Sequence, residues 1–215
     1  MRKKITNWRS TLTIHAIIWD IGGVLERTED PDPRQEIAER LGTSVPDLTR
    51  LFFGHTDNFR VQLGEITPEE HWENVRNQLG LSKPEMAAAR QAFFAGDRMD
   101  MNLVAYIREL KQQYCTAVLS NYMAVLRSRL MDEWEIDDAF NHLIISAEIG
   151  LMKPGPEIYQ FTLETLGFAP EETVFIDDFI ENIEGAQDVG IHGILFNSPE
   201  QVKKKLNELL KSLKG

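Results

Sequence analysis

The sequence is poor in cysteine, with Cys115 the single cysteine among 215 residues. No disulfide can form within the chain, which excludes the disulfide-stapled folds of small secreted proteins and favours a reducing compartment. We therefore expect a cytoplasmic protein. Cys115 stands in the apolar run YCTAVLSN, where a free cysteine packs as a small hydrophobic residue.

Long apolar runs and an excess of basic residues are also missing. The apolar stretch near the basic N-terminus is too short to cross a bilayer, and it leads to Asp20 rather than to a small-residue cleavage site. The formal net charge of −11 argues against nucleic acid and anionic membranes as partners, because both attract a basic face. A small phosphorylated substrate remains compatible with that charge.

What the sequence does contain is a rhythm of short apolar runs. Five of them have the length and the branched or aromatic content of buried parallel strands. They are 14–19, 115–119, 142–146, 173–176 and 193–196. Stretches with helical spacing lie at 101–113, 122–134, 155–167, 180–190 and 199–214. This alternation predicts an α/β fold with a doubly wound, parallel, Rossmann-like sheet.

Residues 27–97 interrupt this rhythm and contain no convincing strand. Their apolar spacing predicts four helices instead, at 32–42, 45–57, 67–80 and 83–96. The third begins with a capping box, in which Thr67 is followed three residues later by Glu70. We therefore expect an α/β core formed by residues 1–26 and 98–215, with an α-helical insert at 27–97.

Polar side chains follow the predicted strands at their carboxyl ends, which is where open parallel sheets bind ligands. The candidate residues are Asp20, Ser120, Asn121, Lys153, Asp177 and Asp178. Because the carboxyl ends of parallel strands share one edge of the sheet, we expect these side chains to converge. Adjacent acids such as Asp177 and Asp178 repel each other unless something binds them.

The chemistry of this set suits phosphoryl transfer. Clustered carboxylates need a cation, and oxygen ligands suit Mg²⁺. Asp20 can attack phosphorus as a nucleophile, giving an aspartyl-phosphate. Ser120 and Asn121 can hold the phosphoryl oxygens, and Lys153 can stabilise the developing negative charge. The glycines after Asp20 allow the backbone to approach the phosphate closely.

The four motifs IIWDIGGVL, AVLSN, GLMKPGPEIY and VFIDDFIENIEGAQDVGI resemble those of the haloacid dehalogenase superfamily, over residues 14 to about 197. The resemblance implies Asp20 as nucleophile and a Mg²⁺ site. The implied metal ligands are Asp20, Asp177, Asp178 and the main-chain carbonyl of Gly22, with Asn182 in support. It also implies that the insert at 27–97 is a helical cap, as in subfamily I. The cap stretch GEITPEEHW is similar to that of glucose-1-phosphate-type sugar-phosphate phosphatases.

Gly22 departs from the family pattern. Phosphatases of the superfamily usually carry a second aspartate there, and general acid–base help is worth about 10²–10⁴-fold. Water or a cap residue could substitute, and the cap candidates are His55, Glu65 and His71. The stretch 51–60 is expected to face the active site, with Leu51, Phe52 and Phe53 packing in the cap core.

We therefore expect a Mg²⁺-dependent phosphatase that hydrolyses a small phosphorylated metabolite, a sugar phosphate among the options, as a monomer or homodimer. Two other interpretations stay open. A 2-haloacid dehalogenase would use Asp20 to attack carbon and would need no metal. A slow or non-catalytic domain that binds a ligand would explain why Gly22 lacks an acid.

Overall fold

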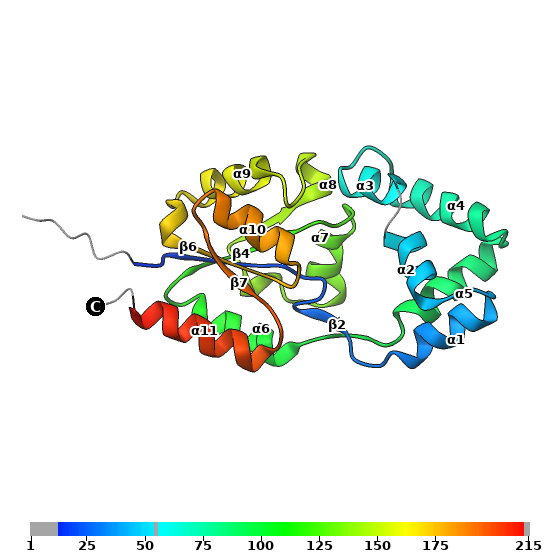
Figure 1. The fold of residues 1–215 in the computed structure, drawn as a ribbon, viewed down its shortest axis with the longest axis horizontal. Helices are drawn as coiled ribbons and strands as arrows, with labels where there is room; N and C mark the ends of the chain where they lie inside the picture. Colours follow the sequence, from blue (N-terminus) through cyan, green and yellow to red (C-terminus); the bar gives the residue numbers. More distant parts are fainter. Residues whose placement is uncertain (1–12, 54–55, 213–215) are drawn as a thin grey trace, which may run out of the picture.

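The computed structural model describes residues 13–53 and 56–212, and its centre is a five-stranded parallel sheet (Figure 1). The strands are β1 (Ala16–Trp19), β4 (Cys115–Ser120), β5 (His142–Ile145), β6 (Thr173–Asp177) and β7 (His192–Leu195). Their order across the sheet is β5-β4-β1-β6-β7. Every predicted strand is therefore present within a residue or two of its expected bounds, and the α/β prediction is confirmed.

Helices cover both faces of this sheet, which explains why the strands read as continuous apolar runs. Alternate residues of β1 enter opposite cores: Trp19 belongs to one buried cluster and Ile18 to the other. The helices α6 (Met101–Leu110) and α11 (Pro199–Ser212) cover the first face, and α9 (Pro156–Leu166) and α10 (Ile180–Asp188) cover the second (Figure 1).

Shorter elements connect the strands of the core. The segment predicted as a helix at 122–134 begins only at α7 (Leu126–Ser128) and continues as a π-helix over Arg129–Glu133. Single turns of helix follow at Asp137–Ala139, at α8 (Ser146–Ile149) and at Pro170–Glu172. Among the described residues no helix is long and apolar enough to cross a membrane.

Five helices lie between β2 (Glu26–Thr28) and β3 (Asp97–Met99) among the described residues, and we call them the cap helices. They are α1 (Asp32–Arg40), α2 (Val45–Phe53), α3 (Thr56–Gln62), α4 (Pro68–Leu79) and α5 (Lys83–Phe94). The prediction of four helices was wrong, because the second helix ends at Phe53 and a separate one begins at Thr56. The capping box at Thr67 is confirmed: its side chain accepts from the Glu70 N–H, and the Glu70 carboxylate accepts from the Thr67 N–H.

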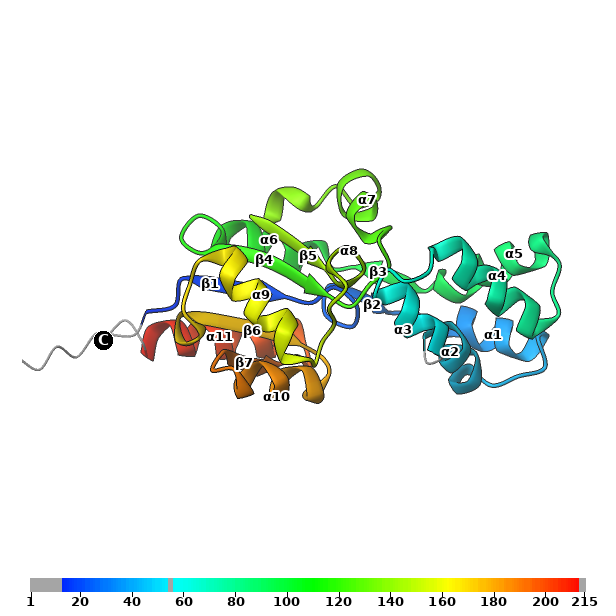
Figure 2. The same ribbon diagram turned by 90° about the horizontal axis from the view of Figure 1, so that it is seen from above.

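The cap helices have a buried cluster of their own. Its members are Ile37, Ala38, Leu48, Phe52, Val75, Met86, Ala89 and Phe93. In Figure 2 these helices lie beyond the ends of β1, β4 and β6 toward which the strands run. The bounds of core and cap stay a prediction, but the separate apolar cluster is what an independently packed insert requires.

Two short strands cross between the cap helices and the sheet, so the expectation of no strand in 27–97 was wrong. β2 (Glu26–Thr28) and β3 (Asp97–Met99) pair antiparallel. Arg27 binds Asp100 at 2.8 Å, and both carboxylate oxygens of Asp97 accept from Arg34 at 2.9 Å. Each strand is three mostly polar residues long, so neither leaves the alternating apolar pattern that announces a strand in a sequence.

Candidate active site

Three carboxylates meet at the edge of the sheet that faces the cap helices. Asp20 follows β1 and Asp177 ends β6. The Asp20 N–H donates to the Ile176 carbonyl at 3.0 Å, which continues the β1–β6 ladder and sets Asp20 beside Asp177. Both side chains are buried, and Ser120, at the end of neighbouring β4, is buried with them. The predicted convergence of these strand ends is therefore observed.

Lys153 lies between two of the acids with its side chain fully buried. Its Nζ is 2.6 Å from Asp177 Oδ2 and 3.1 Å from Asp20 Oδ1, and it donates to the Leu119 carbonyl at 3.0 Å. The Nζ–Asp20 contact is an ion pair without the direction of a hydrogen bond, because Asp20 Oδ1 makes no hydrogen bond among the described residues. One ammonium group thus holds two carboxylates together.

Asn121 positions the Lys153 loop. Its Oδ1 accepts from the Lys153 N–H, and its Nδ2 donates to the Lys153 carbonyl, both at 2.8 Å. The sequence had suggested that this side chain holds phosphate, but the structure gives both of its polar atoms to the backbone of Lys153. Its contact with a phosphate stays a prediction, whereas its contact with the lysine loop is observed.

Asp177 and Asp178 are held differently, although they are neighbours in the chain. The carboxylate of Asp177 accepts from Lys153, from the Phe179 N–H at 2.8 Å and from Asn182 Nδ2 at 3.0 and 3.1 Å. Asp178 Oδ1 is buried and has no hydrogen-bond partner among the described residues. Buried acceptors are rarely left without a partner, so the Asp178 oxygen is available to a bound cation or donor.

The residues fit a divalent cation with oxygen ligands. Carboxylate oxygens of Asp20, Asp177 and Asp178 lie within 4.8 Å of one another. Buried oxygens of Asp20 and Asp178 lack hydrogen bonds among the described residues, and Lys153 brings one positive charge against three negative ones. A hard cation such as Mg²⁺ would satisfy both the oxygens and the charge. The carbonyl of Gly22 is in the adjoining turn, and its part in metal binding stays a prediction.

Burial is the largest cause of the pKa shifts in this cluster. It raises the pKa of Asp20, while the charge of Lys153 and the hydroxyl of Ser120 lower that pKa only in part. Burial, followed by the charges of Asp20 and Asp177, raises the pKa of Asp178 to about 7. Burial alone would lower the pKa of Lys153, but the charges of the two carboxylates outweigh it and raise that pKa. Lys153 is therefore charged, and Asp178 is easily protonated until a cation binds.

Gly22 and Gly23, which follow Asp20 in the turn after β1, have different surroundings. A Cβ built on Gly22 would meet no atom within 4 Å, whereas a Cβ on Gly23 would lie 2.0 Å from Asp178 Oδ2. Gly23 also has a φ of 76°, which favours glycine. Gly23 is thus required by the approach of Asp178. Nothing in the packing requires a glycine at position 22, and there is room there for a side chain or a water.

The three cap candidates for the missing acid differ in their placement. His55 lies outside the described residues. His71 is buried in the cap, with its ring 4.9 Å from that of Trp72. Glu65 is 3.4 Å from Arg60 and lines a cavity of about 240 Å³ that also contacts Ala124 and Ala147 of the core. Glu65 is therefore the described candidate that faces a space between cap and core.

The apolar residues of the stretch 51–60 are divided. Phe52 is fully buried in the cap cluster and Leu51 packs against that cluster. Phe53 packs its ring against Phe52 and Phe93 but leaves 38% of its surface exposed. Phe53 is therefore only in part a core residue.

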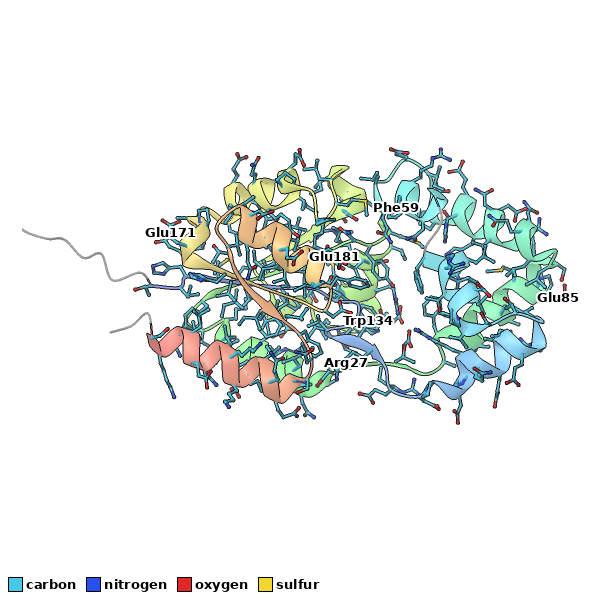
Figure 3. All side chains as sticks on the ribbon, in the orientation of Figure 1. Arg27, Phe59, Glu85, Trp134, Glu171 and Glu181 are labelled. Atoms are coloured by element: carbon cyan, nitrogen blue, oxygen red, sulfur yellow. The ribbon has the colours of Figure 1, made fainter. Side chains whose placement is uncertain are left out.

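A network beside the site was missed by sequence reasoning. Arg129 donates to the hydroxyl of Tyr122, binds Glu26 of β2 at 3.0 Å and lies 4.0 Å from the ring of Trp134. Figure 3 shows Trp134 on the side of the core nearest the cap. Burial raises the pKa of Tyr122 to about 12, so its hydroxyl stays protonated. The network connects the loop after β4 to β2, the strand that leads into the cap. No local sequence motif predicts it.

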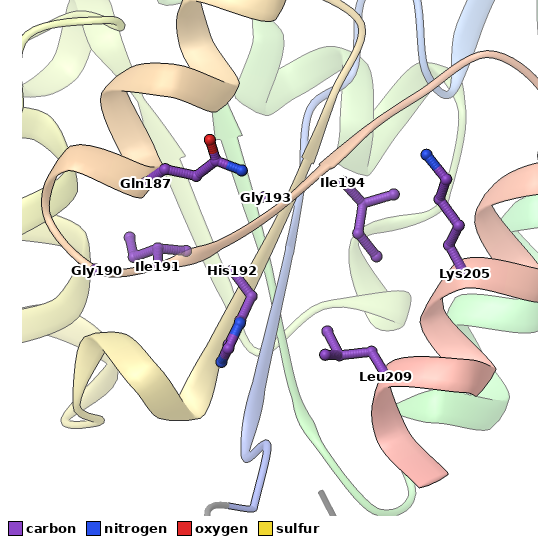
Figure 4. Close-up of a pocket in the computed structure, with 8 residues that line it drawn as sticks. All are labelled: Gln187, Gly190, Ile191, His192, Gly193, Ile194, Lys205 and Leu209. Carbon is purple, nitrogen blue, oxygen red and sulfur yellow. The ribbon is translucent and has the colours of Figure 1, made fainter. Parts of the chain in front are cut away.

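A larger cavity of about 390 Å³ lies elsewhere, between β7, the end of α10 and α11 (Figure 4). Its lining includes His192, which pairs with Val174 near the amino end of β6, whereas Asp177 stands at the carboxyl end of that strand. The lining contains no carboxylate. This cavity is therefore separate from the acid cluster.

Comparisons with known proteins identify the family of this chain. A model of the haloacid dehalogenase-like hydrolase family matches residues 14–190. The sesquiterpene phosphatase astK of Aspergillus oryzae is 31% identical over 186 residues, covering 85% of this chain and 89% of that protein. The D-ribitol-5-phosphate phosphatase of Bacteroides thetaiotaomicron is 27% identical over 219 residues, covering 93% of this chain and all of that protein.

A solved structure offers a geometric comparison. An enzyme of the same family from Bacteroides thetaiotaomicron, in complex with magnesium and inorganic phosphate, is 26% identical with a TM-score of 0.69. The match covers 86% of this chain and 94% of that one. The chain also matches longer bifunctional epoxide hydrolases, of which it spans only 14–39%.

Proposed function

This chain belongs to the haloacid dehalogenase-like hydrolase family, and from that premise we propose that it is a Mg²⁺-dependent phosphatase of small phosphorylated metabolites. One observation carries the proposal. Three buried or half-buried carboxylates meet at one edge of the sheet, a single lysine pairs with two of them, and two of their oxygens lack hydrogen bonds among the described residues. Such a cluster calls for a cation and for an anionic substrate that the cation helps to hold.

The reaction begins at Asp20. A carboxylate oxygen of Asp20 attacks the phosphorus, the bond from phosphorus to the ester oxygen breaks, and an aspartyl-phosphate forms. Lys153 keeps Asp20 oriented and ionised through the 3.1 Å ion pair and offsets negative charge as it builds on the phosphoryl oxygens. The hydroxyl of Ser120, beside Asp20, can donate to one of those oxygens. Mg²⁺, held by Asp20, Asp178 and Asp177, would supply further positive charge there.

Release of the product requires two proton transfers that a side chain at position 22 would normally assist. We assign them to water in the space beside Gly22, where a Cβ would meet nothing within 4 Å. One water gives a proton to the leaving oxygen and becomes hydroxide. This hydroxide takes a proton from a second water as that water attacks the phosphorus, the bond between phosphorus and the Asp20 oxygen breaks, and phosphate and the Asp20 carboxylate are released. This substitution predicts a slower reaction than an enzyme with an acid there, by about 10²–10⁴-fold.

The relatives support the reaction class and leave the substrate open. One is named a phosphatase of a sesquiterpene and another a phosphatase of D-ribitol 5-phosphate. A metal-free dehalogenase is the weaker alternative, because the buried Asp178 oxygen would remain without a partner in it. A binding domain without turnover stays the second alternative, since Gly22 lacks the acid.

The test is phosphate release from acetyl phosphate and from a panel of sugar, alkyl and aryl phosphates, with Mg²⁺ and with EDTA. We expect release that requires Mg²⁺ and is abolished by Asp20→Asn. Asp132→Asn, at an exposed aspartate of the π-helix, is the matched control and should keep full activity. Phosphate release that persists in EDTA would exclude the metal requirement, and full activity of Asp20→Asn would exclude Asp20 as the nucleophile.

A further inference from the structure

Large apolar side chains gather at the edge of the molecule where the acids lie. The most exposed of them is Phe179, at 61%, which directly follows Asp178. Ile180 comes next in the chain, and Val125 lies in the loop that follows β4; both are exposed. The N–H of Phe179 donates to Asp177 Oδ1 at 2.8 Å, so the ring stands one residue from the candidate metal ligands. Exposed apolar clusters of this kind mark binding surfaces.

The cap presents aromatic rings from the other side. Phe53 ends α2 and contacts the ring of Phe94, which ends α5, at 5.9 Å between ring centres. Phe94 lies three residues before β3, and β3 pairs with β2. Because β2 begins only six residues after Asp20, this pair of strands joins the cap to the core close to the acids. The two rings are thus at the end of the cap nearest the core. Phe59 of α3 is half exposed and lies on the core-facing side of the cap in Figure 3.

We propose that these residues form an apolar rim that binds a hydrocarbon or aromatic leaving group. The rim consists of Phe53, Phe59, Phe94, Val125, Phe179 and Ile180. The substrate class is then the phosphate monoester of an apolar alcohol rather than of a sugar or polyol. This rests on the proposed phosphatase function and names its substrate.

The choice between the two classes follows from what each would need. A polyol requires several converging hydrogen-bond donors and acceptors, because its hydroxyl groups lose water on binding. An apolar chain requires contact area alone. The rim offers rings and branched side chains on both sides of the site, so burial of an apolar chain against it is the favourable event.

The experiment compares kcat/KM for butyl, hexyl and octyl phosphate with that for glucose 1-phosphate and ribitol 5-phosphate. Acetyl phosphate, which is activated and too small to reach the rim, reports the basal reaction. We expect kcat/KM to rise with chain length by up to about fourfold per methylene, and by roughly tenfold or more from butyl to octyl. Sugar and polyol phosphates should fall below octyl phosphate.

Two variants locate the effect. Phe179→Ser and Phe53→Ser should each reduce the octyl-to-acetyl ratio of kcat/KM by about fivefold or more, as loss of a ring from an apolar contact predicts. Phe161→Ser, at a phenylalanine of α9 that is 37% exposed and outside the rim, should keep the wild-type ratio. The ratio cancels any loss that affects both substrates alike, and Phe179, on an exposed loop, can be replaced without disturbing the cap core.

The outcomes separate the two proposals. Turnover of acetyl phosphate without a chain-length effect, or with a preference for polyol phosphates, would overturn the apolar rim and leave the phosphatase standing. A chain-length effect that persists in both serine variants would place the apolar site elsewhere and also overturn the rim. No turnover of any phosphate would overturn the phosphatase itself, and the rim proposal with it.

Discussion

Replacing Lys153 by methionine should lower the free energy of unfolding while leaving the folded structure largely unchanged. Methionine is similar in length and keeps the apolar part of the side chain, but it removes the ammonium group. Asp20 and Asp177 would then be buried without the cation that now lies 3.1 and 2.6 Å from them. Lys153→Met therefore tests whether the acids are held by this one charge.

The magnitude follows from the burial. Removing one partner of a fully buried ion pair costs about 3–5 kcal/mol, because the remaining charge is left uncompensated. For a chain of this size each kcal/mol lowers Tm by about 2–4 °C, so a fall of roughly 6–20 °C is expected. Loss of the lysine also raises the pKa of Asp20 further. The native state then binds protons more readily than the unfolded state, so the loss of stability is smaller at pH 5 than at pH 8.

The assay is thermal and urea unfolding of wild type and variant without metal, at both pH values, and again with Mg²⁺. Lys204→Met, on the exposed face of α11, is the matched control and should unfold like wild type. Mg²⁺ at a hundred times its Kd should return about 2.7 kcal/mol to any form that binds it. A Lys153→Met protein within about 1 kcal/mol of wild type, with no dependence on pH, would refute the reasoning.

Three further predictions concern the glycine pair and the metal. Gly22→Asp should fit without strain and speed phosphate release from alkyl phosphates by about 10²-fold or more. The rate with acetyl phosphate should change little, because its acetate is a good leaving group. An unchanged rate with alkyl phosphates would mean that proton transfer by water does not limit the reaction. Gly23→Ala is its counterpart: a Cβ 2.0 Å from Asp178 Oδ2 should weaken Mg²⁺ binding, which titration calorimetry measures. Because the pKa of Asp178 is about 7 without a cation, Mg²⁺ binding should release about half a proton at pH 7, less at pH 8.5 and more at pH 6. Calorimetry in buffers of different ionisation enthalpy would detect this, and binding without proton release at pH 7 would contradict the assigned role of Asp178.

The sheet was readable from the sequence because its strands are buried on both faces. Runs such as 14–19 and 173–176 carry apolar residues at every position, and helices between them leave a strong periodic pattern. The strands β2 and β3 were not readable, since each has three mostly polar residues and gains its pairing from a partner about 70 residues away. The break between α2 and α3 was also missed, because the apolar residues keep helical spacing across it.

The residues of the candidate site could be predicted from the sequence, but their contacts and distances could not. The acids and Lys153 are at the expected strand ends, since strand polarity alone brings them to one edge. The sequence could not tell that Asp177 accepts from Lys153, Asn182 and Phe179, whereas Asp178 Oδ1 has no hydrogen bond to any residue that the structure describes. That distinction depends on side-chain rotamers and loop packing, which cannot be predicted from the spacing of residues in the sequence.

Because β2 and β3 pair antiparallel, the helical insert begins and ends at neighbouring points and can be removed or exchanged. The chain leaves the sheet and returns to it through strands that lie side by side, with Thr28 opposite Asp97 at the end nearest the helices. Neighbouring antiparallel strands can be joined by a turn of two residues. The five helices can therefore be cut out and replaced by a tight turn, or exchanged for another unit, at one pair of adjacent points. Such an exchange would change the cap side of the proposed apolar rim and leave the acids at the ends of β1 and β6 in place.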